Sequence, residues 1–193
     1  MGDSVTIVGC YPQLSRIVGE VWVMNDWYMR EALSHLEPDR IFQLHWSWMK
    51  VRNPGRFEGD WKRVCRDTKA LVTTLDELED LPSELLDIKM MTKCFKSEDL
   101  SNSLAIIIGV AILDGYRYIK VTGAHLLGAE FIYEIHGVLN MIDRARSQGI
   151  KVEADFESQW RENKKKINWE EIEFSSLPYW KRDKRVGEKD VTN

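Results

Sequence analysis

The sequence predicts an α/β protein in which helices cover both faces of a mainly parallel sheet. Two short apolar runs near the amino end, residues 7–9 and 21–24, each stop at a turn-forming residue, Gly9 and Asn25. Further along, strand-like apolar runs alternate with helix-length patterns. Such alternation indicates parallel strands joined by crossover helices, because a tight turn cannot connect parallel neighbours. The expected fold is therefore a Rossmann-like three-layer α/β fold with a C-terminal extension.

Six segments have the length and composition of buried strands. They are short, mainly apolar and bounded by turn-forming or charged residues. The segments are residues 7–9, 21–24, 40–45, 70–74, 118–123 and 150–152. Between residues 76 and 100, the apolar pairs fit either a short helix or a short strand, and both stay open.

Helices are expected in the connections. Pro12 suits the first turn of a helix that Gly19 ends, and Asn25 or Asp26 suits the cap of a helix that runs toward Leu36. A further helix carries Trp61, Val64 and Cys65. Residues 104–113 are apolar throughout, which predicts a helix buried on most sides. The last helix has apolar residues at helical spacing and ends at Gly149; they are Phe131, Ile135, Val138, Leu139 and Ile142.

Composition sets the class of protein. The chain has 193 residues, of which 44% are apolar and 30% charged, as in an ordinary globular domain. We expect a nucleotide-binding domain over residues 1–154 and a partly ordered, charged and aromatic extension over 155–193. The net charge of −4 gives no indication of nucleic-acid binding. No apolar stretch has the length of a membrane span, and the three cysteines lack metal or disulfide spacing, so a cytoplasmic protein without a membrane partner is expected.

Nucleotides bind at the carboxyl ends of the strands in open α/β sheets, where helix N-termini present unpaired amides. The expected nucleotide-binding residues are Gly9, Cys10, Tyr11, Asn25, Ser101, Ser103 and Gly123. For Asn25 a helix cap is the equal alternative, and Ser101 and Ser103 also fit plain caps.

Histidines and tryptophans supply candidates for chemistry. His125 directly follows the strand that ends at Gly123, so it is the preferred general base, and His136 on the polar side of the next helix is the second choice. An acceptor-side cluster is expected from His45, Trp46 and Trp48, since indole faces stack on sugar rings. Core packing is the simpler explanation of these tryptophans. No metal motif or nucleophile elbow is present.

Three segments together resemble the glycosyltransferase superfamily of bacterial CMP-sialic-acid sialyltransferases and related bacteriophage proteins. In that superfamily a first strand runs into Gly-Asn-Gly-Pro-Ser, a second ends in Asn followed by aromatics, and an apolar helix leads through Gly-Tyr into a strand that ends in Gly. The matching segments here are 7–14, 24–28 and 103–123. The chain departs from the pattern at Cys10 and Tyr11, and it has Ala124-His125 where an acidic residue is usual.

The resemblance implies a nucleotide-sugar-dependent glycosyltransferase-like protein that takes a nucleotide-sugar donor as its substrate and needs no cofactor. The alternative is a non-catalytic protein that binds or sequesters a nucleotide or a protein on the same fold, and the departures at Cys10 and Tyr11 favour it. A second copy of the chain or a host protein are the further partners considered.

Overall fold

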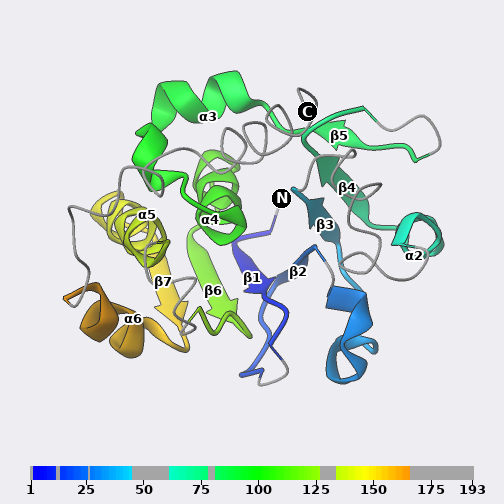
Figure 1. Cartoon of the computed structure of the whole chain (residues 1–193), viewed down its shortest axis with the longest axis horizontal. Helices are drawn as coiled ribbons and strands as arrows, with labels where there is room; N and C mark the ends of the chain where they lie inside the picture. The colour runs from blue at the N-terminus through cyan, green and yellow to red at the C-terminus, as the bar shows by residue number, and fades with distance from the viewer. Residues whose placement is uncertain are drawn as a thin grey trace, which may run out of the picture.

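A computed structural model describes residues 2–11, 14–25, 27–44, 61–77, 81–126 and 134–165. These residues form a seven-stranded sheet in the order β5-β4-β3-β2-β1-β6-β7 (Figure 1). Every neighbouring pair is parallel. The strands are β1 Ser4–Val8, β2 Glu20–Met24, β3 Arg40–Gln43, β4 Leu71–Thr74, β5 Glu84–Leu85, β6 Tyr118–Thr122 and β7 Lys151–Ala154. The predicted Rossmann-like α/β class is confirmed.

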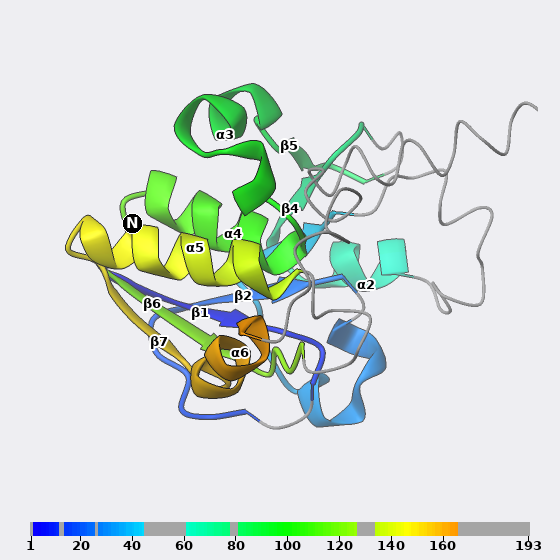
Figure 2. The same cartoon turned by 60° about the vertical axis from the view of Figure 1, so that its left-hand side comes forward.

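Helices lie on both faces of the sheet, as Figure 2 shows in side view. One face carries α3 (Ile88–Cys94), α4 (Ser103–Leu113) and α5 (Ile135–Ser147), which pack over the larger apolar core. The other face carries α2 (Trp61–Asp67) and two 3₁₀ turns, η1 (Trp27–Met29) and η2 (Glu31–Leu33), over a smaller core. The helix α6 (Glu157–Lys164) follows β7 and packs beside α5.

The central helix α4 is enclosed on all sides, as its uninterrupted apolar sequence predicts. Every residue from Ser103 to Ile112 is buried. A β-carbon on Gly109 would lie 2.7 Å from a methyl group of Met91 and 3.0 Å from one of Met141. Gly109 therefore lets α3 and α5 pack closely against α4.

The prediction of two helices before β3 was wrong. Residues 14–18 form no helix. The Thr6 hydroxyl donates to the Val18 carbonyl at 2.7 Å and accepts from the Val18 amide at 2.8 Å, so neither backbone group of Val18 is available for helical hydrogen bonds. The helix expected toward Leu36 is replaced by η1 and η2. Arg30 between them is extended, with φ −98° and ψ 109°, which interrupts any continuous helix.

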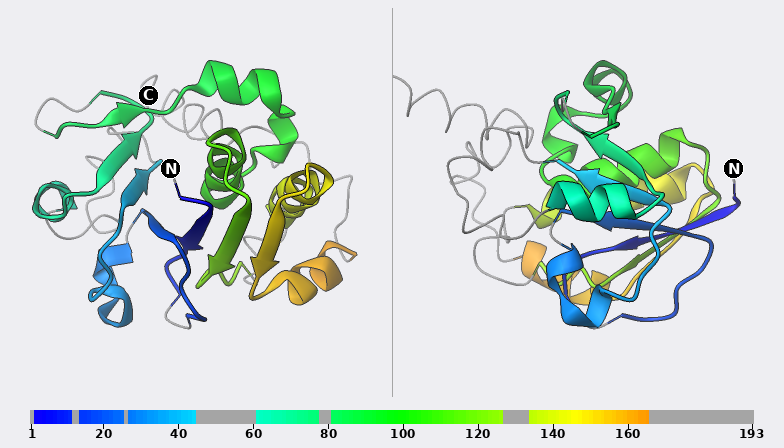
Figure 3. Two further views of the ribbon diagram at one scale, coloured as in Figure 1. Left: turned by 180° about the vertical axis from the view of Figure 1, so that it is seen from behind. Right: turned by 90° about the vertical axis from the view of Figure 1, so that its right-hand side faces the viewer.

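The other elements match the prediction closely. The helices predicted around Trp61 and over 104–113 are α2 and α4, and the last helix ends before Gly149, whose φ is +81°. The open stretch 76–100 contains β5, α3 and a 3₁₀ turn, η4 (Ser97–Asp99). Figure 3 shows the same elements from behind and from the edge of the sheet. Over the described ranges, no helix combines the length and apolarity needed to span a bilayer.

Candidate functional site

The chain reverses its direction of travel across the sheet between β1 and β6. From β1 it proceeds outward to β5 and then returns to place β6 on the other side of β1. The segment after β1 packs on the smaller core through Leu14 and Ile17, whereas the segment after β6 leads to α5 on the opposite face. In open α/β sheets such a switch point is where ligands bind, beyond the carboxyl ends of the strands. Gly9, Cys10 and Tyr11 follow β1 at this point, and Gly123 and His125 follow β6.

Asn25 connects three elements at the carboxyl edge. Its side-chain Nδ2 donates to the hydroxyl of Ser103 at 3.4 Å, and its Oδ1 accepts from the amide of Leu44 at 3.4 Å. Its backbone φ is +48°, in the left-handed region that only a few non-glycine residues adopt. An N-cap typically has an extended backbone and directly precedes its helix, whereas Asn25 is left-handed and η1 begins at Trp27, which argues against the N-cap interpretation of Asn25.

The start of α4 lies beside Asn25. Asn102 is the cap residue, and its Oδ1 accepts from the Ala105 amide at 2.8 Å. Ser103 comes next and supplies the hydroxyl that Asn25 contacts. Ser101 is fully buried and donates instead to the carbonyl of Glu134 at 3.0 Å, which ties the start of α5 to that of α4. Ser103 is thus at the edge, and Ser101 stands behind it.

Cys10 joins the same group from β1. Its thiol donates to the carbonyl of Met24 at 3.4 Å, directly before Asn25. Asn25 contacts Ser103 and directly follows the residue that Cys10 contacts, so we group Cys10, Asn25 and Ser103 as the edge cluster. All three cysteines of the chain fall in described segments and are reduced thiols.

The turn after β1 is held against the end of β6 by backbone hydrogen bonds. The Gly9 amide donates to the Thr122 carbonyl at 2.9 Å, and the Tyr11 amide donates to the Gly123 carbonyl at 2.8 Å. Gly123 has a φ of +63°, which suits glycine. These bonds extend the β1–β6 pairing beyond the strands and occupy two of the amides that a phosphate cradle in this turn would use.

Aromatic rings cover the ends of β6 and β7. The Tyr11 ring lies parallel to the His125 imidazole, with ring centroids 4.6 Å apart and planes inclined by 15°. Phe156 meets both rings edge-on, at 6.0 Å from Tyr11 and 5.2 Å from His125. We call these three residues the aromatic slab. The indole Nε1 of Trp160 donates to the His125 carbonyl at 3.0 Å, so α6 helps to hold the slab in place.

His136 is not where the sequence pattern suggested. It was expected on the polar side of its helix, but it lies in the first turn of α5 and is only 4% exposed. The reason is that α5 begins at Ile135 and packs its first turn against α4, with Ser101 and Asn102 both donating to the Glu134 carbonyl. His125, by comparison, is half-buried.

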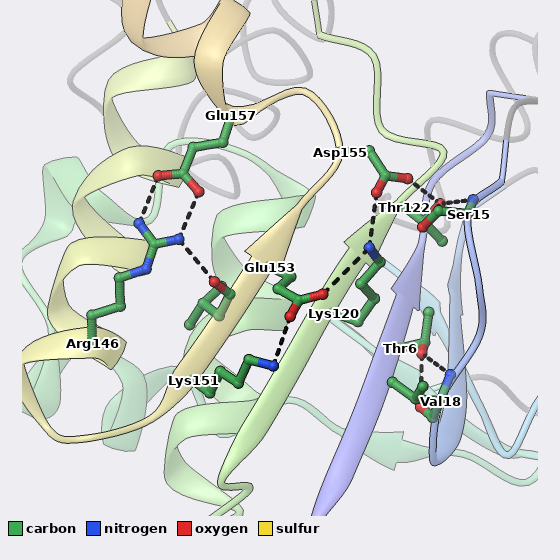
Figure 4. Close-up of polar contacts among 11 residues, drawn as sticks. Thr6, Ser15, Val18, Lys120, Thr122, Arg146, Lys151, Glu153, Asp155 and Glu157 are labelled. Atoms are coloured by element: carbon green, nitrogen blue, oxygen red, sulfur yellow. Dashed lines mark hydrogen bonds and ion pairs between the residues drawn. The ribbon is translucent and has the colours of Figure 1, made fainter.

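A polar network around Thr122 fixes the end of β6 (Figure 4). The Thr122 hydroxyl donates to Asp155 and accepts from the Ser15 amide at 2.8 Å. The ammonium of Lys120 lies 3.0 Å from the Asp155 carboxylate. Burial alone raises the pKa of Asp155, but hydrogen bonds from Thr122, Lys120 and Ser15 outweigh it and hold that pKa below its usual value. Thr122 is thereby anchored through its hydroxyl as well as through its backbone.

The structure brings the predicted residues into two neighbouring groups. Cys10, Asn25 and Ser103 form the edge cluster, while Tyr11 and His125 stack beside it. His45, Trp46 and Trp48 lie outside the described residues, so the acceptor side stays a prediction. Across the part of the chain that is described, no three His, Cys, Asp or Glu side chains are grouped as a metal site.

Sequence reasoning missed Asn102, Phe156 and Trp160. Asn102 had a readable signal, since Asn is a preferred cap and stands directly before the apolar helix. Phe156 had none, because its role depends on how α6 turns back after β7. The aromatic residues of the extension, Trp160 among them, predicted that it docks back on the domain, and Trp160 is fully buried, but nothing in the sequence indicated its contact with His125.

The fold of the chain is similar to that of a solved structure. No family model and no curated protein sequence matches the chain. Among solved structures, the chain is similar to the sialyltransferase CstII from Campylobacter jejuni, determined in complex with a substrate analogue, cytidine-5'-monophosphate. The alignment covers 78% of each chain at 14% sequence identity, with a TM-score of 0.48.

Proposed function

We propose that this protein binds a nucleotide or nucleotide-sugar at the carboxyl edge of its sheet. The observation that carries the proposal is the contact between Asn25 and Ser103, which are 78 residues apart in the chain and meet beside the switch point. An amide and a hydroxyl can each donate and accept hydrogen bonds, as the ribose hydroxyls and phosphate oxygens of a nucleotide require. The start of an 11-residue helix adds a favourable field for the phosphate.

The unusual backbone of Asn25 supports a ligand-directed role. A left-handed conformation costs most non-glycine residues about 1–2 kcal/mol, and Asn less, because its short side chain can hydrogen-bond locally. Such conformations persist where the surrounding structure enforces them, and they gather at ligand sites. Here the contacts to Ser103 and Leu44 enforce it.

The reaction proposed for this site is glycosyl transfer, as the sequence resemblance implies. A base removes the proton of an acceptor hydroxyl, and the acceptor oxygen bonds to the anomeric carbon of the donor. The bond from that carbon to the nucleotide phosphate breaks, and the nucleotide leaves as an anion. Of the two histidines proposed as base, His125 is the more accessible.

A non-catalytic nucleotide-binding or protein-binding role is the second candidate. The slab favours it, because His125 has one ring face covered by Tyr11 and is met edge-on by Phe156. His136 is nearly excluded from solvent. A general base in transfer must reach the acceptor hydroxyl, and these contacts restrict the approach to His125 and close it at His136.

Thermal denaturation with a panel of nucleotides tests the binding proposal. CMP, UMP, UDP, GDP and CMP-sialate are each added to the full chain. A specific ligand at a hundredfold excess over its Kd stabilises the fold by about 2.7 kcal/mol, so the melting temperature should rise by several degrees. No shift with any nucleotide would refute the proposal. Release of free sugar or nucleotide from CMP-sialate then separates the two candidates, since only a transferase hydrolyses its donor slowly without an acceptor.

A further inference from the structure

The aromatic slab presents one ring to solvent in a fixed orientation. Tyr11 is 37% exposed, whereas Trp160 behind the slab is completely buried. One face of the Tyr11 ring lies on His125, and Phe156 supports its edge. The exposed part of this ring is held in place and is free to contact a flat ligand.

The Tyr11 backbone is fixed as firmly as its ring. Its amide donates to the Gly123 carbonyl at 2.8 Å. A β-carbon on Gly123 would lie 2.7 Å from the Tyr11 carbonyl oxygen, so the two turns are in direct contact. His125 is held in turn by Trp160. A ligand that stacks on Tyr11 therefore meets a ring that is already immobilised, which lowers the entropy cost of binding.

The position of Tyr11 relates it to the edge cluster. Cys10, the residue before it, contacts the Met24 carbonyl, and Asn25 follows Met24. The amides of Gly9 and Tyr11 are engaged with β6, so this turn offers a ligand the Tyr11 ring rather than a row of amide donors. A nucleotide has one flat apolar part, its base, and the base is what an aromatic ring face binds.

We propose that the Tyr11 ring is the stacking platform for the base of the bound nucleotide, with the ribose and phosphate directed toward Asn25 and Ser103. This inference rests on the nucleotide-binding function proposed above and assigns a specific role within it. Stacking uses the ring face of the base and not its edges. Tyr11 thus contributes affinity for any nucleotide and none for a sugar phosphate that lacks a base.

Two ligands separate stacking from every other role of Tyr11. CMP and ribose 5-phosphate are titrated into the full chain and followed by NMR, which also measures weak binding. Tyr11→Ala should weaken CMP binding about tenfold and leave ribose 5-phosphate binding unchanged. Tyr11→Phe keeps the ring and should bind CMP within about twofold of wild type. Tyr11→Leu keeps apolar bulk without an aromatic face and should behave as Tyr11→Ala does.

The control is Tyr118→Ala, at the opposite, amino end of β6, where the ring contacts Lys151. It should leave CMP binding unchanged. Equal weakening of both ligands by Tyr11→Ala would overturn the inference, because the residue would then act through the turn. Unchanged CMP binding in Tyr11→Ala or Tyr11→Leu would overturn it as well. If wild type binds neither CMP nor any other nucleotide, the proposed function itself fails, and that result is distinct from either of these.

Discussion

A β-carbon placed on Gly9 would lie 2.4 Å from the carbonyl oxygen of Gly123, closer than any real contact of that kind. The two glycines therefore allow the ends of β1 and β6 to meet. Gly9→Ala should destabilise the fold by about 3 kcal/mol or more, because backbone must move on both strands. Urea denaturation of both proteins measures this loss as a difference in the free energy of unfolding.

Gly149→Ala is the matched control for that substitution. Gly149 has a positive φ of +81°, which Gly9 does not, and no atom lies within 4 Å of the place that a β-carbon would take, so only conformational strain of about 1–2 kcal/mol is expected. Equal losses from the two substitutions would show that the contact between the strand ends is not the critical feature.

Substitutions of Asn25 should affect stability and nucleotide binding differently, because its backbone is left-handed. Asn25→Ala incurs left-handed strain and loses two long side-chain hydrogen bonds, which together cost about 2 kcal/mol. Asn25→Gly removes the strain and should recover about half of that loss. Both lack the amide, so both should weaken nucleotide binding by about tenfold. An Asn25→Gly variant that binds nucleotide as tightly as wild type would leave Asn25 with a structural role only.

The carboxylate of Asp155 should stabilise the fold at neutral pH and lose that effect in acid. Its pKa in the folded state is lowered by Thr122, Lys120 and Ser15 against the effect of burial. The stabilisation is therefore fully present above the unfolded pKa, about 3.9, and is lost as the pH falls through the folded pKa. Asp155→Asn should flatten the rise of unfolding free energy between about pH 2 and pH 5.

Asp114 should change the pH dependence of stability in the opposite direction to Asp155. Burial raises its pKa more than the neighbouring Arg40 lowers it. Its folded pKa thus exceeds the unfolded one, and its contribution falls as the pH rises through the interval between them. Asp114→Asn should therefore raise the slope of unfolding free energy against pH above about pH 4, whereas Asp155→Asn lowers that slope mainly below it. The same urea titrations across pH test both, and slopes that change in the same direction would contradict this account.

Trp160 should stabilise the fold at the carboxyl ends of the strands. It is fully excluded from solvent and bonded to the His125 carbonyl. Trp160→Phe keeps most of the packing but loses the hydrogen bond, at a cost of about 1 kcal/mol, whereas Trp160→Ala should cost about 3–5 kcal/mol. Calorimetric unfolding compares them. Similar losses from both would assign the stability to the hydrogen bond rather than to packing.

Much of the fold could be predicted because its signals are local. The apolar helix 104–113 is buried on every side, and the glycine at 149 ends α5 with a positive φ. The segments around β2 could not be predicted in this way. Pro12 and Gly19 are typical of a short helix, yet the hydrogen bonds of Thr6 to Val18 hold residues 14–18 in an irregular path, and that contact spans 12 residues.

The site was predictable in position but not in detail. Strand ends mark the carboxyl edge in the sequence, which is why Cys10, Asn25 and Ser103 were chosen and lie together. The burial of His136 depends on how the start of α5 packs on α4, and the stacking of Tyr11 on His125 joins residues far apart in the chain. Neither relationship leaves a periodic or compositional trace.

The most direct measurement is an NMR titration of the isotope-labelled full chain with CMP, read at each backbone amide. Binding at the carboxyl edge predicts saturable shifts that are largest at Tyr11, Asn25 and Ser103, while residues at the opposite ends of the strands, such as Tyr118 and Arg40, stay unchanged. Saturable shifts confined to another surface, or none at millimolar CMP and with the other nucleotides, would contradict the account.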